Sequence, residues 1–235
     1  MCLPGRSYRR LVRVVVAGLV LGLALLTTAE LADLLVHVDN GVLDALVARR
    51  TAGWTGFATA VTNTGASPFT YPLVAIAGLV VARRTRRWRP GVVALAVVVL
   101  GVLSRLLLSV LVRDTRPDQD LWLVPVGGFS FPSGHAAASA LLAGTLIWLV
   151  GRAGLPRLPR IGFGIVLLGW AFLVGVSRLY LGVHWVSDVV GSWLLAAAWV
   201  CALPLLDPVR GDRREAGGAA TTEPAGQGGS AVPPV

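Results

Sequence analysis

Residues 177–188 read SRLYLGVHWVSD, and no other stretch of the chain is as informative about its fold and chemistry. An arginine, a histidine and an aspartate (Arg178, His184 and Asp188) stand at fixed spacing in sequence that is otherwise largely apolar. A charged group at membrane depth costs roughly 3 kcal/mol to insert, so the charged groups that do occur there are candidates for function. Residues 177–188 are therefore expected to form part of a functional site.

The composition around this stretch is typical of a membrane protein. Of the 235 residues, 55% are hydrophobic and only 14% are charged, and the mean hydropathy is +0.72. A net charge of +9 could indicate nucleic-acid binding. However, the arginines cluster in short loops beside apolar runs, as the positive-inside rule predicts for membrane proteins. We expect the lipid bilayer and no nucleic acid as a partner, and the sequence leaves the oligomeric state open.

Six apolar runs predict membrane-spanning helices, because a span needs about 20 apolar residues. Residues 30–65 instead mix charges with an apolar stripe, which predicts one or two amphipathic helices at the membrane surface. The sequence thus predicts an all-α, polytopic membrane helical bundle over residues 1–206. Residues 207–235 are rich in Gly, Ala, Pro and Thr, which predicts a disordered cytoplasmic tail. The predicted spans are residues 11–29, 69–82 with a start near 66, 90–112, 136–150, 161–176 and 189–206.

Arginine counting predicts the topology. Arginines gather before the first span, between the second and third, between the fourth and fifth, and after the sixth. With six spans, all four groups lie on one side, which the positive-inside rule assigns to the cytoplasm. The opposite side receives residues 30–65, residues 113–131 and the turn around His184. The sequence therefore predicts a multi-pass protein of the cell membrane whose functional site faces the extracytoplasmic side.

Residues 132–135 read PSGH and have the features of an anion-binding helix start. Proline is favoured at the first helical position, where its missing N–H is not needed. The N-terminus of a helix offers free N–H groups and a positive dipole end to an anion. Gly134 lets a ligand approach, Ser133 adds a hydroxyl donor, and His135 projects from the first turn.

His184 and Asp188 are four residues apart. They either share one face of a helix or Asp188 reaches back to a ring nitrogen. A carboxylate on one imidazole nitrogen fixes the tautomer and leaves the other nitrogen free to attack. Arg178 precedes His184 by six residues, and its planar guanidinium suits two phosphate oxygens. Together with Arg116 and Pro117 upstream, these residues indicate a phosphate-handling site with a histidine nucleophile.

With these motifs the sequence resembles the type 2 phosphatidic acid phosphatase superfamily, whose pattern is K-x6-RP, PSGH and SR-x5-H-x3-D. The second and third blocks match residue for residue, and the resemblance covers roughly residues 104–206. It implies an all-helical bundle and metal-free phosphoester hydrolysis. By this resemblance His184 is the nucleophile and forms a phosphohistidine, Asp188 orients it, and His135 protonates the leaving oxygen and then activates water. The residues implied to hold the phosphate oxygens are Arg116, Ser133, Gly134 and Arg178.

One position departs from the family pattern. The lysine expected seven residues before Arg116 is replaced by Ser109. Arg105 and Arg113 lie one helical turn on either side of Ser109, so either could restore the missing positive charge. We expect Arg113 to do so because it is nearer the loop, with the deeper Arg105 as the alternative.

The leading functional hypothesis is an integral-membrane phosphatase that hydrolyses the phosphomonoester or pyrophosphate of a lipid, phosphatidate-like or polyprenyl. One alternative is a lipid phosphotransferase on the same scaffold. Another is a non-catalytic lipid-binding or transport protein, in which Ser109 marks lost catalysis; the intact His184, Asp188 and His135 argue against it. The chain shows no cluster of carboxylates or thiols with metal-ligand spacing, so neither a metal nor another cofactor is expected.

Overall fold

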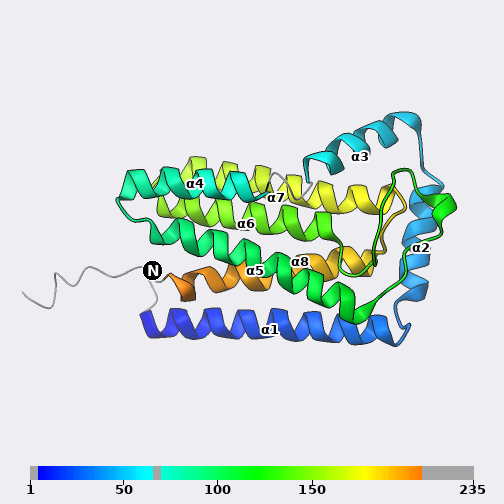
Figure 1. Ribbon diagram of the computed structural model, residues 1–235, viewed down its shortest axis with the longest axis horizontal. Helices are drawn as coiled ribbons and strands as arrows, with labels where there is room; N and C mark the ends of the chain where they lie inside the picture. Colours follow the sequence, from blue (N-terminus) through cyan, green and yellow to red (C-terminus); the bar gives the residue numbers. More distant parts are fainter. Residues whose placement is uncertain (1–4, 66–69, 208–235) are drawn as a thin grey trace, which may run out of the picture.

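The computed structural model describes residues 5–65 and 70–207 (Figure 1). These residues form eight α-helices and a short 3-10 helix, with no β-strand among them. The helices are α1 (Gly5–Leu31), α2 (Val36–Val47), α3 (Ala52–Thr64), α4 (Thr70–Thr85), α5 (Arg89–Val112), η2 (Gln119–Leu121), α6 (Gly134–Arg152), α7 (Arg157–Tyr180) and α8 (Val186–Leu206). The all-α prediction is therefore confirmed.

Five of these helices, α1, α5, α6, α7 and α8, are long and apolar enough to cross a membrane. Each contains one of the predicted spans. The remaining predicted span corresponds to α4, whose 16 described residues would cover about 24 Å at 1.5 Å per residue. The predicted start of this span, near residue 66, lies outside the described residues.

The long helices run side by side as an up-and-down bundle with α6 near its centre (Figure 1). Helix α6 packs against α4, α5, α7 and α8, whereas α1 packs mainly along α8. Small residues let these helices approach closely, as is common between membrane helices. A Cβ at Gly144 in α6 would lie 2.5 Å from a methyl of Val200 in α8. A Cβ at Gly78 in α4 would lie 2.8 Å from the Cα of Gly91 in α5.

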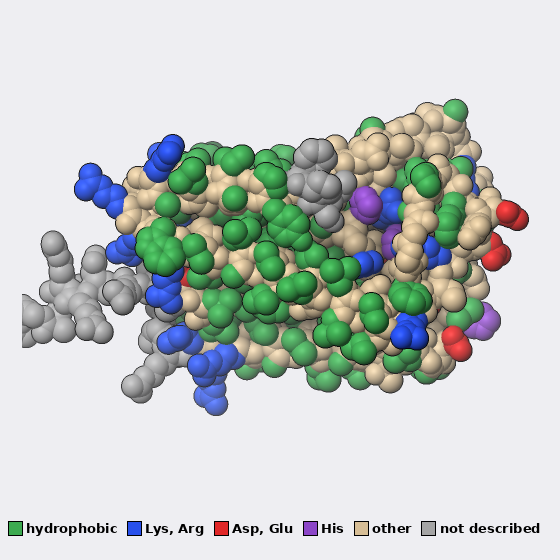
Figure 2. All heavy atoms as spheres, in the orientation of Figure 1, with side chains coloured by type: hydrophobic (Ala, Val, Ile, Leu, Met, Phe, Trp, Pro, Cys, Tyr) green, Lys and Arg blue, Asp and Glu red, His purple; other side chains and the backbone are tan. Residues whose placement is uncertain are grey.

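The two ends of the bundle differ in charge and in covering elements. The α4–α5 and α6–α7 connections lie at the same end as the start of α1, and arginine side chains cluster there (Figure 2). The opposite end carries α2, α3 and the long connection between α5 and α6 (Figure 1). The three arginine-rich segments within the described residues thus share one end, as the sequence predicted, and the fourth, which follows the last span, lies outside them. At that end Asp207, where the predicted tail begins, is buried and pairs with Arg152 at 3.2 Å and Arg89 at 3.4 Å. Residues 208–235 of this predicted tail lie outside the described part.

The predicted amphipathic segment forms two helices, α2 and α3. Helix α2 lies across the end of the bundle, and α3 packs obliquely on α7 (Figure 1). Ala58 and Thr62 form the buried part of α3, while Trp54 and Phe57 are 62% and 48% exposed. Exposed aromatic rings at a bundle end suit the membrane interface.

Candidate active site

The site is built around a tight turn between α7 and α8 that carries His184. The turn passes through Gly182, whose φ of 73° lies in the left-handed region. A Cβ at this position would overlap the carbonyl oxygen of Leu121, so only glycine fits here. The N–H of Val183 donates to the Arg178 carbonyl at 3.3 Å, which links the turn to the last turn of α7.

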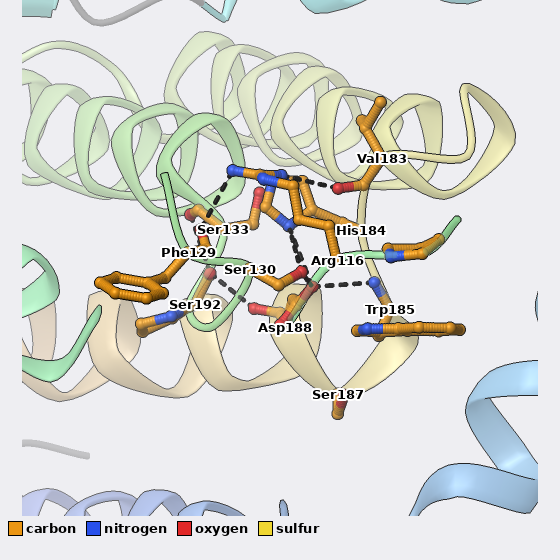
Figure 3. Close-up of polar contacts among 12 residues, drawn as sticks. Arg116, Phe129, Ser130, Ser133, Val183, His184, Trp185, Ser187, Asp188 and Ser192 are labelled. Carbon is orange, nitrogen blue, oxygen red and sulfur yellow. Dashed lines mark hydrogen bonds and ion pairs between the residues drawn. The ribbon is translucent and has the colours of Figure 1, made fainter. Parts of the chain in front are cut away.

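His184 and Asp188 form a buried pair, with side chains 2% and 0% exposed. His184 precedes α8 while Asp188 lies in its first turn, so the two do not share a helix face. Asp188 instead reaches back, and its Oδ2 lies 2.9 Å from Nδ1 of His184. The same oxygen accepts hydrogen bonds from the N–H of Trp185 at 2.8 Å and from the hydroxyl of Ser130 (Figure 3).

The partners of the imidazole define its tautomer. Nδ1 faces the Asp188 carboxylate and Nε2 lies 3.0 Å from Nη1 of Arg116. A guanidinium can only donate, so Nε2 accepts and the ring proton sits on Nδ1. Complete burial, followed by the charges of Arg116, Arg178 and Arg105, lowers the pKa of His184 well below 6.5. The ring is therefore neutral at pH 7, with the Nε2 lone pair directed at Arg116.

Arg116 is fixed by the protein on every side. Its Nε donates to the Gly128 carbonyl, and Nη2 donates to the carbonyls of Gly127 and Phe129, at 3.0–3.1 Å. Nη1 donates to the Val183 carbonyl at 2.6 Å and contacts His184 (Figure 3). Arginine has five N–H donors, and all five are used here. Only the N–H shared with His184 points at Nε2 of that ring. Burial lowers the pKa of Arg116 from its ordinary value.

The PSGH segment begins α6 later than the sequence suggested. Pro132 is not the first helical residue; the helix begins at Gly134, and Ser133 is its N-cap. The N–H of Ser133 donates to the Asp188 carbonyl at 3.3 Å, and its carbonyl accepts from Ser192 at 2.9 Å. These bonds join the start of α6 to the first turn of α8 and hold Ser133 at the N-cap, so Pro132 lies outside the helix.

Two buried donors of the site have no hydrogen-bond partner in the described part of the chain. They are the hydroxyl of Ser133, whose residue is fully buried, and Nε of Arg178, whose residue is 2% exposed. Arg178 is otherwise held by α3, because its Nη1 donates to Thr62 at 3.0 Å. A buried donor without a partner costs roughly 1–3 kcal/mol. These two donors are therefore candidate contacts for a bound anion.

The two candidate substitutes for the family's lysine lie in different surroundings. The guanidinium of Arg105 packs on Gly134, 3.5 Å from where a Cβ would stand, and its Nε donates to the Pro132 carbonyl at 2.8 Å. Arg113 is exposed and its Nε donates back to the Val110 carbonyl. The structure thus brings Arg105 to the start of α6, while the side chain of Arg113 folds back on its own helix.

His135 is the second residue of α6 and is partly buried. It lies close enough to Arg178 to interact with the charge of that guanidinium. The predicted residues Arg116, Ser133, Gly134, His135, Arg178, His184 and Asp188 are therefore brought to one end of the bundle, together with Arg105.

Three supporting residues were not found from the sequence. Ser130 binds the His184–Asp188 pair from the loop before α6. Asp39 of α2 accepts hydrogen bonds from the N–H and the hydroxyl of Ser187 at 3.0 and 2.9 Å. Thr62 of α3 holds Arg178. Proximity to the PSGH segment could have drawn attention to Ser130, whereas no local pattern marks Asp39 or Thr62.

Comparisons with known proteins agree on one family. The model of the PAP2 superfamily matches residues 90–211. Phosphatidylglycerophosphatase B of Bacillus subtilis (strain 168) is 33% identical over 159 residues, which cover 67% of this chain and 77% of that protein. An undecaprenyl-diphosphatase of Sulfolobus acidocaldarius is 40% identical over 75 residues, or 32% of each chain.

A solved structure shares the fold over most of its length. It is the crystal structure of a transmembrane PAP2-type phosphatidylglycerolphosphate phosphatase from Bacillus subtilis. The TM-score is 0.75 with 30% sequence identity, and the match covers 82% of this chain and 95% of that one.

Proposed function

Since this chain belongs to the PAP2 superfamily, we propose that it is an integral-membrane lipid phosphatase. It hydrolyses the phosphomonoester or pyrophosphate of a membrane lipid through a phosphohistidine on His184, without a metal ion. One observation carries the proposal: a histidine of fixed tautomer lies near three arginines and next to a buried hydroxyl that has no partner among the described residues. Such a site supplies a nucleophile for attack on phosphorus and fixed donors that stabilise the negative charge of the phosphate oxygens.

In the first step Nε2 of His184 attacks phosphorus, and the bond from phosphorus to the lipid oxygen breaks. Asp188 holds the Nδ1 proton and stabilises the positive charge that develops on the ring. His135 donates its proton to the leaving lipid oxygen. Arg178, Ser133 and the first N–H groups of α6 bind the phosphate oxygens. Before the reaction one N–H of Arg116 donates to Nε2 of His184. When the Nε2 lone pair attacks phosphorus, this N–H donates to a phosphate oxygen instead.

In the second step water hydrolyses the phosphohistidine. His135, now deprotonated, takes a proton from the attacking water, and the oxygen of that water bonds to phosphorus. The bond between phosphorus and Nε2 breaks, inorganic phosphate leaves, and both histidines return to their starting states. The cations that meet the phosphate charge are arginines throughout, so the reaction requires no divalent metal.

The position of the site suits a lipid whose phosphate reaches the membrane surface. The site lies at the bundle end opposite the arginine-rich connections (Figure 2), so the positive-inside rule favours the extracytoplasmic side. A polar pocket of about 420 Å³ opens beside Arg116 and is lined by loop residues between 113 and 129.

Trapping the intermediate tests the proposal. Purified protein is mixed with lipid phosphate labelled with 32P, quenched in alkali, and assayed for protein-bound label that acid releases. We expect label and phosphate release in the parent and in His37→Ala, a control at an exposed histidine of α2. Both should vanish in His184→Ala, with a loss of several orders of magnitude in rate. Phosphate release by His184→Ala within tenfold of the parent would remove the nucleophile.

A further inference from the structure

We infer that Arg105 is the third phosphate-binding cation of this site, acting in place of the lysine that the family pattern has at position 109. This inference rests on the proposed function and concerns the same site. A phosphoryl group in transfer spreads negative charge over three equatorial oxygens, and an enzyme meets this charge with fixed donors. With serine at position 109, another cation of this chain must supply the missing charge.

The Arg105 guanidinium stands directly against the start of α6. Its Cζ lies 3.5 Å, and its Nη2 3.6 Å, from where a Cβ of Gly134 would stand. The Nε–H donates to the Pro132 carbonyl at 2.8 Å, which aims the rest of the group along the start of the helix. Because Ser133 and His135 flank the same helix N-terminus, the guanidinium lies at the anion-binding end of α6.

Arg105 also has free donors, whereas Arg116 does not. Arg116 has every N–H engaged by carbonyl oxygens or by His184. Among the described residues Arg105 makes only its Nε bond, so both of its terminal nitrogens can turn to a ligand. Arg178 has its Nε free of a partner within the same part of the chain. Before His184 attacks, the donors open to a phosphate are therefore those of Arg105 and Arg178, and the Arg116 N–H that contacts Nε2 joins them as the lone pair is used.

The depth of the Arg105 charge in the bundle also indicates a role. Arg105 lies seven residues before the end of α5, which is about 10 Å at 1.5 Å per residue. Placing an arginine at such depth in a membrane helix costs free energy, so an arginine found there is a candidate for function. The described residues place no carboxylate within ion-pair distance of it. The positive charge of Arg105 is therefore not neutralised by a carboxylate of the described residues and is available to bind an anion.

The register of α5 explains how an arginine at position 105 can replace a lysine at position 109. Positions 105 and 109 are one turn apart and share a helix face. Ser109 is small and buried at 4% exposure, while the longer arginine reaches the start of α6 from the deeper turn. Arg113, one turn above, has left the helix with a φ of 56° and is exposed.

Phosphate release and anion binding test the inference together. Four proteins are compared in detergent with phosphatidate as substrate: the parent, Arg105→Gln, Arg113→Gln and the double variant Arg105→Gln with Ser109→Lys. We expect Arg105→Gln to lower kcat/KM at least 30-fold and Arg113→Gln, the matched arginine at the end of the same helix, to change it less than threefold. Adding Ser109→Lys to Arg105→Gln should raise kcat/KM at least tenfold, because the lysine returns the positive charge to the position where the family pattern has it.

Binding of orthovanadate, followed by calorimetry, separates this inference from the proposed function. Arg105→Gln should weaken vanadate binding at least tenfold while Arg113→Gln leaves it unchanged, whether or not phosphatidate is turned over. If the parent releases no phosphate from any lipid but the vanadate results hold, the proposed function fails and the role of Arg105 stands. Unchanged vanadate binding and turnover in folded Arg105→Gln, or equal losses in Arg113→Gln, would overturn the inference. If the glutamine variant does not fold, Arg105→Leu, which buries no polar group, takes its place with the same expected losses.

Discussion

Replacing Ser130 by alanine isolates the contribution of one hydrogen bond to the carboxylate that pairs with His184, the proposed nucleophile. The Ser130 hydroxyl donates to Oδ2 of Asp188 and lies 3.4 Å from Nδ1 of His184. The same carboxylate oxygen also accepts from His184 and from the N–H of Trp185. Alanine removes one of these three donors and leaves the other two in place.

The expected size of the effect follows from the charge of the acceptor. A hydrogen bond to a charged group contributes about 1.5–3 kcal/mol, and each 1.4 kcal/mol is tenfold in rate. Ser130→Ala should therefore lower turnover about 10- to 100-fold. The loss should appear in kcat rather than KM, because Ser130 contacts the histidine–carboxylate pair and not the predicted phosphate site.

Initial rates of phosphate release from a lipid phosphate in detergent measure this effect. Ser139→Ala is the matched control, since Ser139 is equally buried and its hydroxyl bonds only the Ala136 carbonyl of its own helix. Both variants should show cooperative thermal unfolding near that of the parent. A kcat of Ser130→Ala within threefold of the parent, or a change confined to KM, would refute the idea that this hydroxyl supports the nucleophile.

Metal dependence, topology and pH provide three further tests. Activity should survive chelators and fall with orthovanadate, because arginines supply the positive charge; an absolute divalent-cation requirement in a rate assay would contradict this. In a background without the two native cysteines, Gln119→Cys should react with an impermeant thiol reagent on intact cells and Arg87→Cys should not; the reverse labelling would invert the topology. Burial and nearby carboxylates raise the pKa of Asp114 to about 7, so this group favours the fold when protonated, and that benefit is lost as pH rises from about 4 through 7. The ionised Asp114 should thus destabilise the fold at pH 8 by roughly 1 kcal/mol after solvent screening. In a thermal melt, Asp114→Asn should therefore raise Tm by about 2–4 °C at pH 8 and by less at pH 5.

Local sequence was enough to predict the scaffold and to propose the reacting groups. A span is a property of consecutive apolar residues, so hydropathy located α1, α5, α6, α7 and α8 without tertiary information. The His184–Asp188 pair is equally local, because four residues of chain bring the two groups within 2.9 Å. The start of α6 was predicted wrongly: Pro132 suits a first helical position, yet hydrogen bonds from α8 fix Ser133 as the N-cap.

Tertiary structure alone distinguished the two candidate cations and showed which residues hold His184. Arg105 and Arg113 are equivalent by register around Ser109. Only the left-handed turn that ends α5, together with the packing of α5 against α6, separates them. The contact between Ser130 and Asp188 spans 58 residues of chain. Distances along the sequence do not encode such contacts, because they depend on how helices distant in sequence pack. Residue types and short spacings therefore led to the proposed chemistry of this protein, and the packing of the bundle determined how the residues of the site are placed.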